Sequence, residues 1–181
     1  MFSISNSKRL SFKLMNKDDA DLLFQLDQDP EVMRYLTGGI PASKQQITEI
    51  FLPRMQAYRD SEKGWGIWQV NVSETNEYIG WVLVRPMHFF SENTELDNLE
   101  LGWRFFRASW GKGYASEAAQ QILDAFSANK DYNFFSAIAD KNNLGSIGVM
   151  KNIDMEYVKT YIHTDSMLGD LDVVLYRIEN K

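Results

Sequence analysis

The sequence predicts a mixed α/β fold of the α+β type, a single domain over residues 1–181 with a mostly antiparallel sheet of about seven strands flanked by helices. The chain is 44% hydrophobic and 13% aromatic, which suits one complete core. Short alternating or wholly apolar segments predict the strands, and apolar stripes at helical spacing predict the helices. Only the strand–helix–strand passage over residues 99–139 has the length of a crossover unit, so the other neighbouring strands should be antiparallel.

The N-terminal part predicts one strand and two helices. Residues 10–14 alternate between apolar and polar side chains as a short strand does, and Asn16 is positioned to cap the helix that follows. Asp29 followed by Pro30 predicts the start of a second, short helix. Aspartate is a good N-cap, and proline fits the first helical turn because its missing N–H is not needed there.

A third helix and three strands should come next. Ser43 and Gln46 have the spacing of a capping box, and the helix they begin should be kinked or split by Pro53. The stretch over residues 85–98, rich in polar and acidic side chains, is interpreted as a loop. The strands around it are predicted at residues 67–72, 78–84 and 99–106.

The C-terminal part alternates helices and strands. An apolar stripe predicts an amphipathic helix over residues 114–128, and residues 134–139 read as a buried strand. A short helix is expected over residues 143–152. Residues 157–164 and 171–178 then form a closing antiparallel pair of strands.

The composition excludes several classes of function. The formal net charge is −6, which argues against a nucleic-acid partner. There is no cysteine, so disulfides, Cys-bound zinc and a thiol nucleophile are excluded. Two histidines, His88 and His163, are too few for a histidine cage, and no metal is expected. No apolar run is long enough for a membrane span and the first residues lack an export signal, so we expect a soluble, cytoplasmic protein without a membrane partner.

The segment Trp110-Gly111-Lys112-Gly113-Tyr114-Ala115-Ser116-Glu117 lies between a predicted strand and an amphipathic helix. Two glycines separated by one residue let the backbone turn tightly and bring several N–H groups close to a ligand. With the positive end of the following helix, these groups form a phosphate site; the alternative is a simple strand-to-helix turn. A P-loop is excluded, and Ser116 stands where a dinucleotide fingerprint needs glycine.

This segment resembles the pyrophosphate-binding motif of the GNAT acyl-CoA N-acetyltransferases, and here it reads Trp110-x-x-Gly113-x-Ala115. Tryptophan at the first position is similar to the ribosomal-protein-alanine N-acetyltransferase (RimJ/RimL-like) branch. The match weakens at Ile153-Asp154-Met155, where Leu-Gly-Phe is typical, and the resemblance covers about residues 8–179. Other motifs that match in order are Asp29–Leu36, Ile79-Gly80, Glu100–Trp103 and Asn143–Ser146.

The resemblance implies a GNAT-like fold that binds acetyl-CoA in a V-shaped opening between the strands near residues 99–106 and 134–139. The backbone N–H near Phe105 would stabilise the oxyanion, and Asn143 would bond the pantetheine arm or cap the next helix. The residues implied in cofactor binding are Phe105, Trp110, Gly111, Lys112, Gly113, Tyr114, Ala115, Ser116 and Asn143.

The implied reaction is acetyl transfer to a primary amine by direct attack in a ternary complex, because the absence of cysteine excludes a cysteinyl intermediate. Glu100 resembles the family's strand carboxylate and is the candidate base, acting through water; the alternative is a solvent-facing or ion-paired glutamate. Ser146 is the candidate donor to the departing thiolate, since Val149 stands where many relatives have a tyrosine. The alternative for Ser146 is a hydroxyl bonded to its own helix.

The expected acceptor is the N-terminal amine of a protein or peptide, whose pKa of about 7.7–8.0 makes it easy to deprotonate. One alternative is a small amine, such as a polyamine, an aminoglycoside or an amino acid, which the negative net charge favours slightly. Another is a catalytically idle acyl-CoA-binding module, which the altered end of the last motif favours. The sequence leaves the oligomeric state open, with a homodimer among the options.

Overall fold

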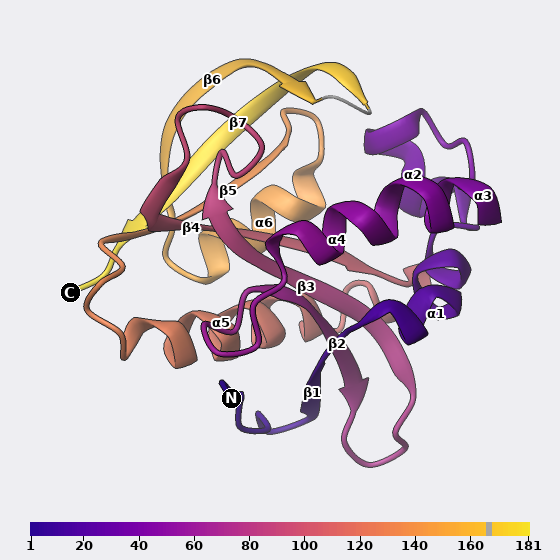
Figure 1. The fold of residues 1–181 in the computed structure, drawn as a ribbon, viewed down its shortest axis with the longest axis horizontal. Coiled ribbons are helices and arrows are strands. Elements are labelled where there is room, and N and C mark those ends of the chain that lie inside the picture. Colours follow the sequence, from indigo (N-terminus) through magenta and orange to yellow (C-terminus); the bar gives the residue numbers. More distant parts are fainter. Residues whose placement is uncertain (166–167) are drawn as a thin grey trace.

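The computed structural model describes residues 1–165 and 168–181. Within these residues a seven-stranded sheet has the order β1-β2-β3-β4-β5-β7-β6 (Figure 1). All neighbouring strands in it are antiparallel except β4 and β5, so the predicted mixed, mostly antiparallel sheet is confirmed. The strands are β1 (Leu10–Leu14), β2 (Gly66–Val72), β3 (Tyr78–Met87), β4 (Glu95–Phe105), β5 (Phe134–Asp140), β6 (Glu156–Asp165) and β7 (Gly169–Glu179).

Helices cover both faces of the sheet (Figure 1). One face carries α1 (Ala20–Leu26), α2 (Pro30–Thr37), α3 (Lys44–Gln46) and α4 (Leu52–Tyr58), and the other carries α5 (Tyr114–Ser127) and α6 (Leu144–Asn152). The predicted caps are present, because Asn16 and Asp29 each accept a bond from a first-turn N–H and Ser43 forms a capping box with Gln46. No helix of the described residues has the length and apolar character needed to cross a membrane.

Regular α-helix is interrupted just ahead of Pro53, as predicted. Between α3 and α4, Ile47–Phe51 form a π-helical turn in which the Leu52 N–H donates to the carbonyl oxygen of Ile47. Proline has no N–H to donate, and its ring crowds the preceding turn of a regular helix. The wider π turn lies where this crowding would fall.

The prediction of a loop over residues 85–98 is wrong at both ends, where the chain forms strand. β3 continues to Met87 and β4 begins at Glu95, with a register shift between Pro86 and Met87. Proline inside an internal strand and acidic residues at the start of the next are both unusual, because proline lacks a ladder N–H and acidic side chains are rare in strands. The register shift follows directly after Pro86, where the ladder between β3 and β4 becomes irregular.

Strands β4 and β5 separate after a short paired stretch. β4 stays paired with β3 as far as Phe105, and β5 stays paired with β7 as far as Asp140. Beyond Glu100 the two strands are no longer paired with each other but keep their outer partners, so they diverge and the sheet opens as a V. This agrees with the predicted opening. The three pairs before it are Asn98 with Phe134, Leu99 with Phe135 and Glu100 with Ser136.

Alternation along β4 divides its side chains between the two helical layers. Leu99, Leu101 and Phe105 are buried in the core beneath α5. Glu100 and Arg104 project from the opposite face, where Arg104 forms an ion pair with Asp27 at the end of α1. The opening between β4 and β5 therefore faces α5 and α6 on one side of the sheet and α1–α4 on the other.

Candidate active site

The glycine segment after β4 forms a turn that leads directly into α5. Gly111 and Gly113 have φ angles of +71° and +77°, which glycine adopts without strain. Among the described residues no side chain caps the first turn of α5, so its N–H groups and the positive end of its dipole face outward. A Cβ atom at Gly111 would meet nothing within 4 Å. This turn fits an anionic group such as a pyrophosphate.

Arg9, just ahead of β1, supports the turn. Its Nε donates to Glu117 Oε2 at 2.6 Å and its Nη1 donates to the Lys112 carbonyl oxygen at 3.0 Å. The guanidinium carbon also lies 4.4 Å from the centre of the Tyr114 ring. Glu117 accepts two further bonds, from the Ser7 hydroxyl and the Arg9 N–H. No local pattern in the sequence points to Arg9, which lies 103 positions from Lys112.

The Arg9–Glu117 contact should make stability depend on pH. Burial alone would raise the pKa of Glu117, but the bonds from Ser7 and Arg9 and the charge of Arg9 bring it below its ordinary value of 4.5. A lowered folded-state pKa adds stability that is present above the unfolded-state value and is lost as the pH falls through the folded-state value. We expect Glu117→Gln to melt at a lower temperature than the wild type at pH 7, and the difference to shrink below pH 4.5.

Thermal unfolding followed by circular dichroism between pH 7 and pH 3 measures this difference. Asp124→Asn is the matched control, because Asp124 is exposed on the same helix and its carboxylate accepts a hydrogen bond from the neighbouring Gln120. A difference between Glu117→Gln and the wild type that stays constant over this pH range would contradict the assigned contact.

Backbone groups of β4 line the opening. The Phe106 N–H donates to the Ile79 carbonyl oxygen of β3 at 3.0 Å. Because peptide groups alternate in direction along an antiparallel strand, those of Phe105 and Trp103 point the other way, into the opening. Trp110 Nε1 donates to the Phe105 carbonyl oxygen at 2.9 Å. The motif tryptophan therefore ties the glycine turn to the end of β4.

The start of α6 forms the other side of the opening. Asn143 Oδ1 accepts from the Ser146 N–H at 3.0 Å, which confirms the capping interpretation of Asn143. The Ser146 hydroxyl oxygen accepts from Trp103 Nε1 at 3.2 Å, a contact that links β4 to α6. At the far end of α6, Asn152 Nδ2 donates to the Ser116 hydroxyl at 3.0 Å. The fold thus brings the predicted cofactor residues around one opening; their roles there stay predictions.

Glu100 lies on the opposite face of β4, at the last pair before the opening. It is 7% exposed, and Arg85 contacts both of its oxygens, with Nε at 2.8 Å from Oε2 and Nη2 at 3.2 Å from Oε1. Burial would lower the pKa of Arg85, but the Glu100 carboxylate outweighs burial and raises it. The ion-paired interpretation of Glu100 is confirmed, and its role as a base stays a prediction. Arg85 itself was not a candidate from the sequence, because it falls in the supposed loop.

Known proteins share sequence and fold with this chain. The sequence profile of the acetyltransferase (GNAT) domain matches residues 9–156. The chain belongs to the GNAT acetyltransferase family. The uncharacterized protein YkkB of Bacillus subtilis (strain 168) is 32% identical over 147 residues, which are 80% of each chain. Like the family, this GNAT protein is an N-acetyltransferase that uses acetyl-CoA, and its described residues hold no group of three or more potential metal ligands.

Solved structures of other acetyltransferases have the same fold at low sequence identity. A GNAT acetyltransferase from Bacillus anthracis aligns with a TM-score of 0.76 and 21% identity over 99% of each chain. RimL, a ribosomal L7/L12 alpha-N-protein acetyltransferase in complex with coenzyme A, gives 0.73 and 14% over 97% of each chain. The aminoglycoside acetyltransferase AAC(6')-Ib in complex with coenzyme A gives 0.71 and 14% over 92% of this chain and 93% of its own. These likenesses show the GNAT fold, and RimL among them is consistent with the RimJ/RimL-like resemblance.

Proposed function

We propose that this GNAT protein acetylates the N-terminal amine of a cytoplasmic protein or peptide, by direct attack within a ternary complex. The observation that carries the proposal is a groove of about 690 Å³, lined more by apolar than by polar surface, among the helices α2–α4. Its lining comes from α2, from the segment between α2 and α4, from α4 and from the residue before β7. It includes Met33, Ile40, Ile50, Phe51, Arg54 and Leu168. A chain that follows its amine can fill this groove, whereas a small amine leaves it empty.

A series of contacts connects the groove to Glu100. Arg54, at the edge of the groove, has its guanidinium carbon 4.2 Å from the centre of the Phe90 ring. The same ring lies 5.4 Å from the guanidinium carbon of Arg85, which is the ion-pair partner of Glu100. A peptide with its amine near Glu100 would therefore pass Phe90 and Arg54 and enter the groove.

The cofactor residues would act from the other face of the sheet. The amides from Gly111 to Ala115 would bind the pyrophosphate, with Trp110 and Ser116 fixing the two ends of the turn. Asn143 would hold the pantetheine arm or the loop before α6. Acetyl-CoA supplies the activated acetyl group as its thioester.

Three groups of the chain would serve the chemistry. Glu100 would take a proton from the acceptor ammonium through a water molecule, which leaves the nitrogen lone pair free to attack. The Phe105 N–H would donate to the developing oxyanion, because the strand alternation directs it into the opening. The Ser146 hydroxyl would donate to the departing thiolate, since its oxygen accepts from Trp103 and its proton is left to donate to another group.

A small amine is the second candidate acceptor. The formal net charge of −6 favours a cationic acceptor, and the likeness to AAC(6')-Ib shows that this fold accommodates an aminoglycoside acetyltransferase. The larger apolar share of the groove lining favours the peptide, because a polycation gains little from contact with apolar side chains.

A panel of acceptors tests the proposal. Free coenzyme A is measured with a thiol reagent, without background from the protein because the chain has no cysteine. Tetrapeptides with a free N-terminus and apolar second and third residues should be acetylated. The same peptides with a blocked N-terminus and one lysine, a polyamine and an aminoglycoside should be poor acceptors. Turnover confined to the polyamine or aminoglycoside would reject the peptide assignment, and no acetyl-CoA binding at millimolar concentration would reject the activity altogether.

A further inference from the structure

β6 contributes a buried hydroxyl group without a hydrogen-bond partner. In residues 1–165 and 168–181, the buried side-chain polar atoms without a partner are Gln69 Oε1, Tyr78 Oη, Trp81 Nε1 and Tyr161 Oη. The first three belong to β2 and β3, whereas Tyr161 lies at the other end of the sheet, on β6. A buried hydroxyl without a partner lowers the stability of the folded protein, so its presence needs an explanation.

The register of the strands places Tyr161 on the same face of the sheet as Glu100. Glu100 pairs with Ser136 on β5, and Ser136 pairs with Arg177 on β7. Val173 is four residues from Arg177 on β7 and therefore shares its face, and Val173 pairs with Tyr161. Residues that are directly paired across a sheet project from one face. Tyr161 and Glu100 thus face the layer formed by α1–α4.

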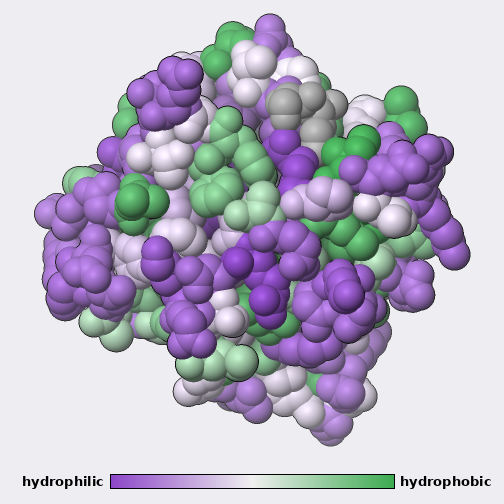
Figure 2. Space-filling model, in the orientation of Figure 1, coloured by the Kyte–Doolittle hydropathy of each residue, from purple (hydrophilic) through white to green (hydrophobic). Residues whose placement is uncertain are grey.

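Contacts from α4 and from the turn between β3 and β4 reach this face of the sheet. Asp165 is four residues beyond Tyr161 on β6 and pairs with Arg54 of α4 at 3.2 Å. Arg54 lies against the Phe90 ring, which also lies against Arg85. Figure 2 shows hydrophobic surface over the β3–β4 turn on this side of the molecule. We call the group formed by Tyr161, Arg54, Phe90 and Glu100 the acceptor cluster.

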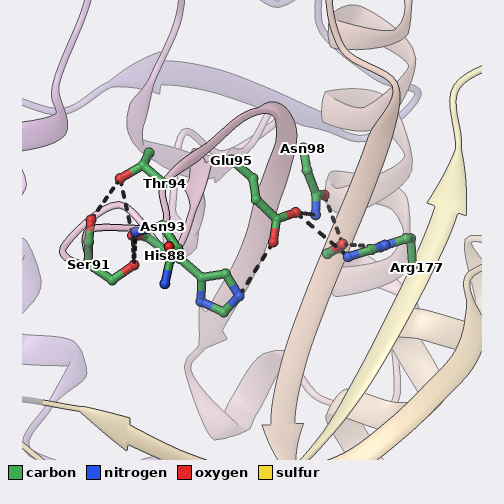
Figure 3. A network of polar contacts seen from close by, with 8 residues as sticks. His88, Ser91, Asn93, Thr94, Glu95, Asn98 and Arg177 are labelled. Atoms are coloured by element: carbon green, nitrogen blue, oxygen red, sulfur yellow. Dashed lines mark hydrogen bonds and ion pairs between the residues drawn. The ribbon is translucent and has the colours of Figure 1, made fainter.

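Glu95 adds a second carboxylate near Tyr161, and a polar network fixes it in place (Figure 3). Its Oε2 accepts from Asn98 Nδ2 at 2.7 Å and lies 3.8 Å from Arg177 Nη2, while its Oε1 lies 3.6 Å from His88 Nε2. Asn98 is fully buried and accepts a further bond from Ser136 at 2.8 Å. The charge of Glu95 is therefore held at one position.

The charged groups of the acceptor cluster and their neighbours form ion pairs, whereas the hydroxyl of Tyr161 has no hydrogen-bond partner. Glu100 is paired with Arg85, and Asp165 with Arg54. Burial, together with the negative charges of Glu100 and Glu95, raises the pKa of the Tyr161 phenol, so the hydroxyl stays protonated. A neutral hydroxyl oxygen near two carboxylates offers its lone pairs to an N–H donor.

We propose, on the basis of the N-acetyltransferase function proposed above, that the Tyr161 hydroxyl accepts a hydrogen bond from the nitrogen of the acceptor amine and orients it toward the opening. A neutral primary amine has two N–H groups, one for Tyr161 and one for the water that leads to Glu100. A secondary amine has only one and cannot satisfy both. Tyr161 therefore selects primary amines, and the bound acceptor supplies the partner that its hydroxyl lacks.

Tyr161→Phe tests this assignment, because it removes the hydroxyl and keeps the ring. We expect kcat/KM for the peptide acceptor to fall about tenfold, the size of one lost hydrogen bond to a polar group. The Kd for acetyl-CoA should stay unchanged. The melting temperature should stay the same or rise, because an unsatisfied buried hydroxyl is removed; a merely structural hydroxyl would give a fall. The advantage of a primary amine over its N-methyl analogue should also diminish.

Tyr157→Phe is the matched control, since Tyr157 lies on the same strand, is 56% exposed and shares a hydrogen bond with Thr160. Its kcat/KM should equal that of the wild type. If the wild type acetylates peptides and Tyr161→Phe acetylates them equally well, or if Tyr161→Phe loses activity only in proportion to a lower melting temperature, the role of Tyr161 is rejected and the proposed function stands. If the wild type acetylates no amine although it binds acetyl-CoA, the proposed function fails first.

Discussion

Gly113→Glu is expected to abolish acetyl-CoA binding, whereas Gly113→Asn should keep most of it. Gly113 has a φ angle of +77° and directly precedes α5. Any side chain there strains the backbone by about 1–2 kcal/mol, and asparagine tolerates this conformation best. Only the glutamate also brings a negative charge to the N–H groups that would bind the pyrophosphate. The bulk of the glutamate and its repulsion of the pyrophosphate should exclude acetyl-CoA. Isothermal titration calorimetry measures the Kd for acetyl-CoA in each variant.

A second glycine offers a matched control for backbone strain. Gly169, at the start of β7, has a φ angle of +75°, and a Cβ atom there would meet nothing within 4 Å. Gly169→Glu therefore adds the same charge with the same strain, away from the turn. Its acetyl-CoA affinity should match that of the wild type. Equal affinities of Gly113→Glu and Gly169→Glu would show that the turn does not bind the pyrophosphate.

The elements that the sequence predicts well depend on short-range signals. The caps at Asn16, Asp29 and Ser43 form because each side chain bonds an N–H two or three residues ahead in the chain. The turn at Gly111 and Gly113 could be predicted for the same reason, since its φ angles favour glycine at those two positions. Signals of this kind are readable from a single sequence.

The contacts that could not be predicted join residues far apart in the chain. Arg9 reaches Lys112 and Glu117 across more than half of the sequence, and no spacing rule connects them. Glu100 could be selected as a candidate from its motif. Its pairing with Arg85 follows from the β3–β4 register, which could not be predicted because Arg85 was assigned to a loop. Tyr161 reaches the Glu100 face only through the order β4-β5-β7-β6, which places β7 between β5 and β6.

Glu100→Gln is expected to lower kcat/KM for a peptide acceptor by about 10²–10⁴-fold at pH 7, the usual contribution of a general base. Glutamine keeps the shape of the side chain and can still accept a bond from Arg85, but it cannot take a proton. Steady-state release of coenzyme A gives kcat/KM. Titration with acetyl-CoA gives the fraction of protein that is folded and binds the cofactor, and each rate is divided by this fraction. Glu92→Gln, in the exposed turn between β3 and β4, removes a carboxylate elsewhere and should leave the rate unchanged.

The dependence of this loss on pH separates a base from a structural ion pair. The α-amine of a peptide has a pKa of about 7.7–8.0, so it is mostly an ammonium ion at pH 7 and mostly neutral at pH 9. The loss in Glu100→Gln should therefore shrink as the pH rises through this range, because the amine no longer needs the base. Ser146→Ala removes the donor to the thiolate instead, and its loss should stay constant over the same range. A loss in Glu100→Gln that does not change with pH would assign Glu100 to the ion pair with Arg85 alone, and an unchanged kcat in both variants would reject the mechanism.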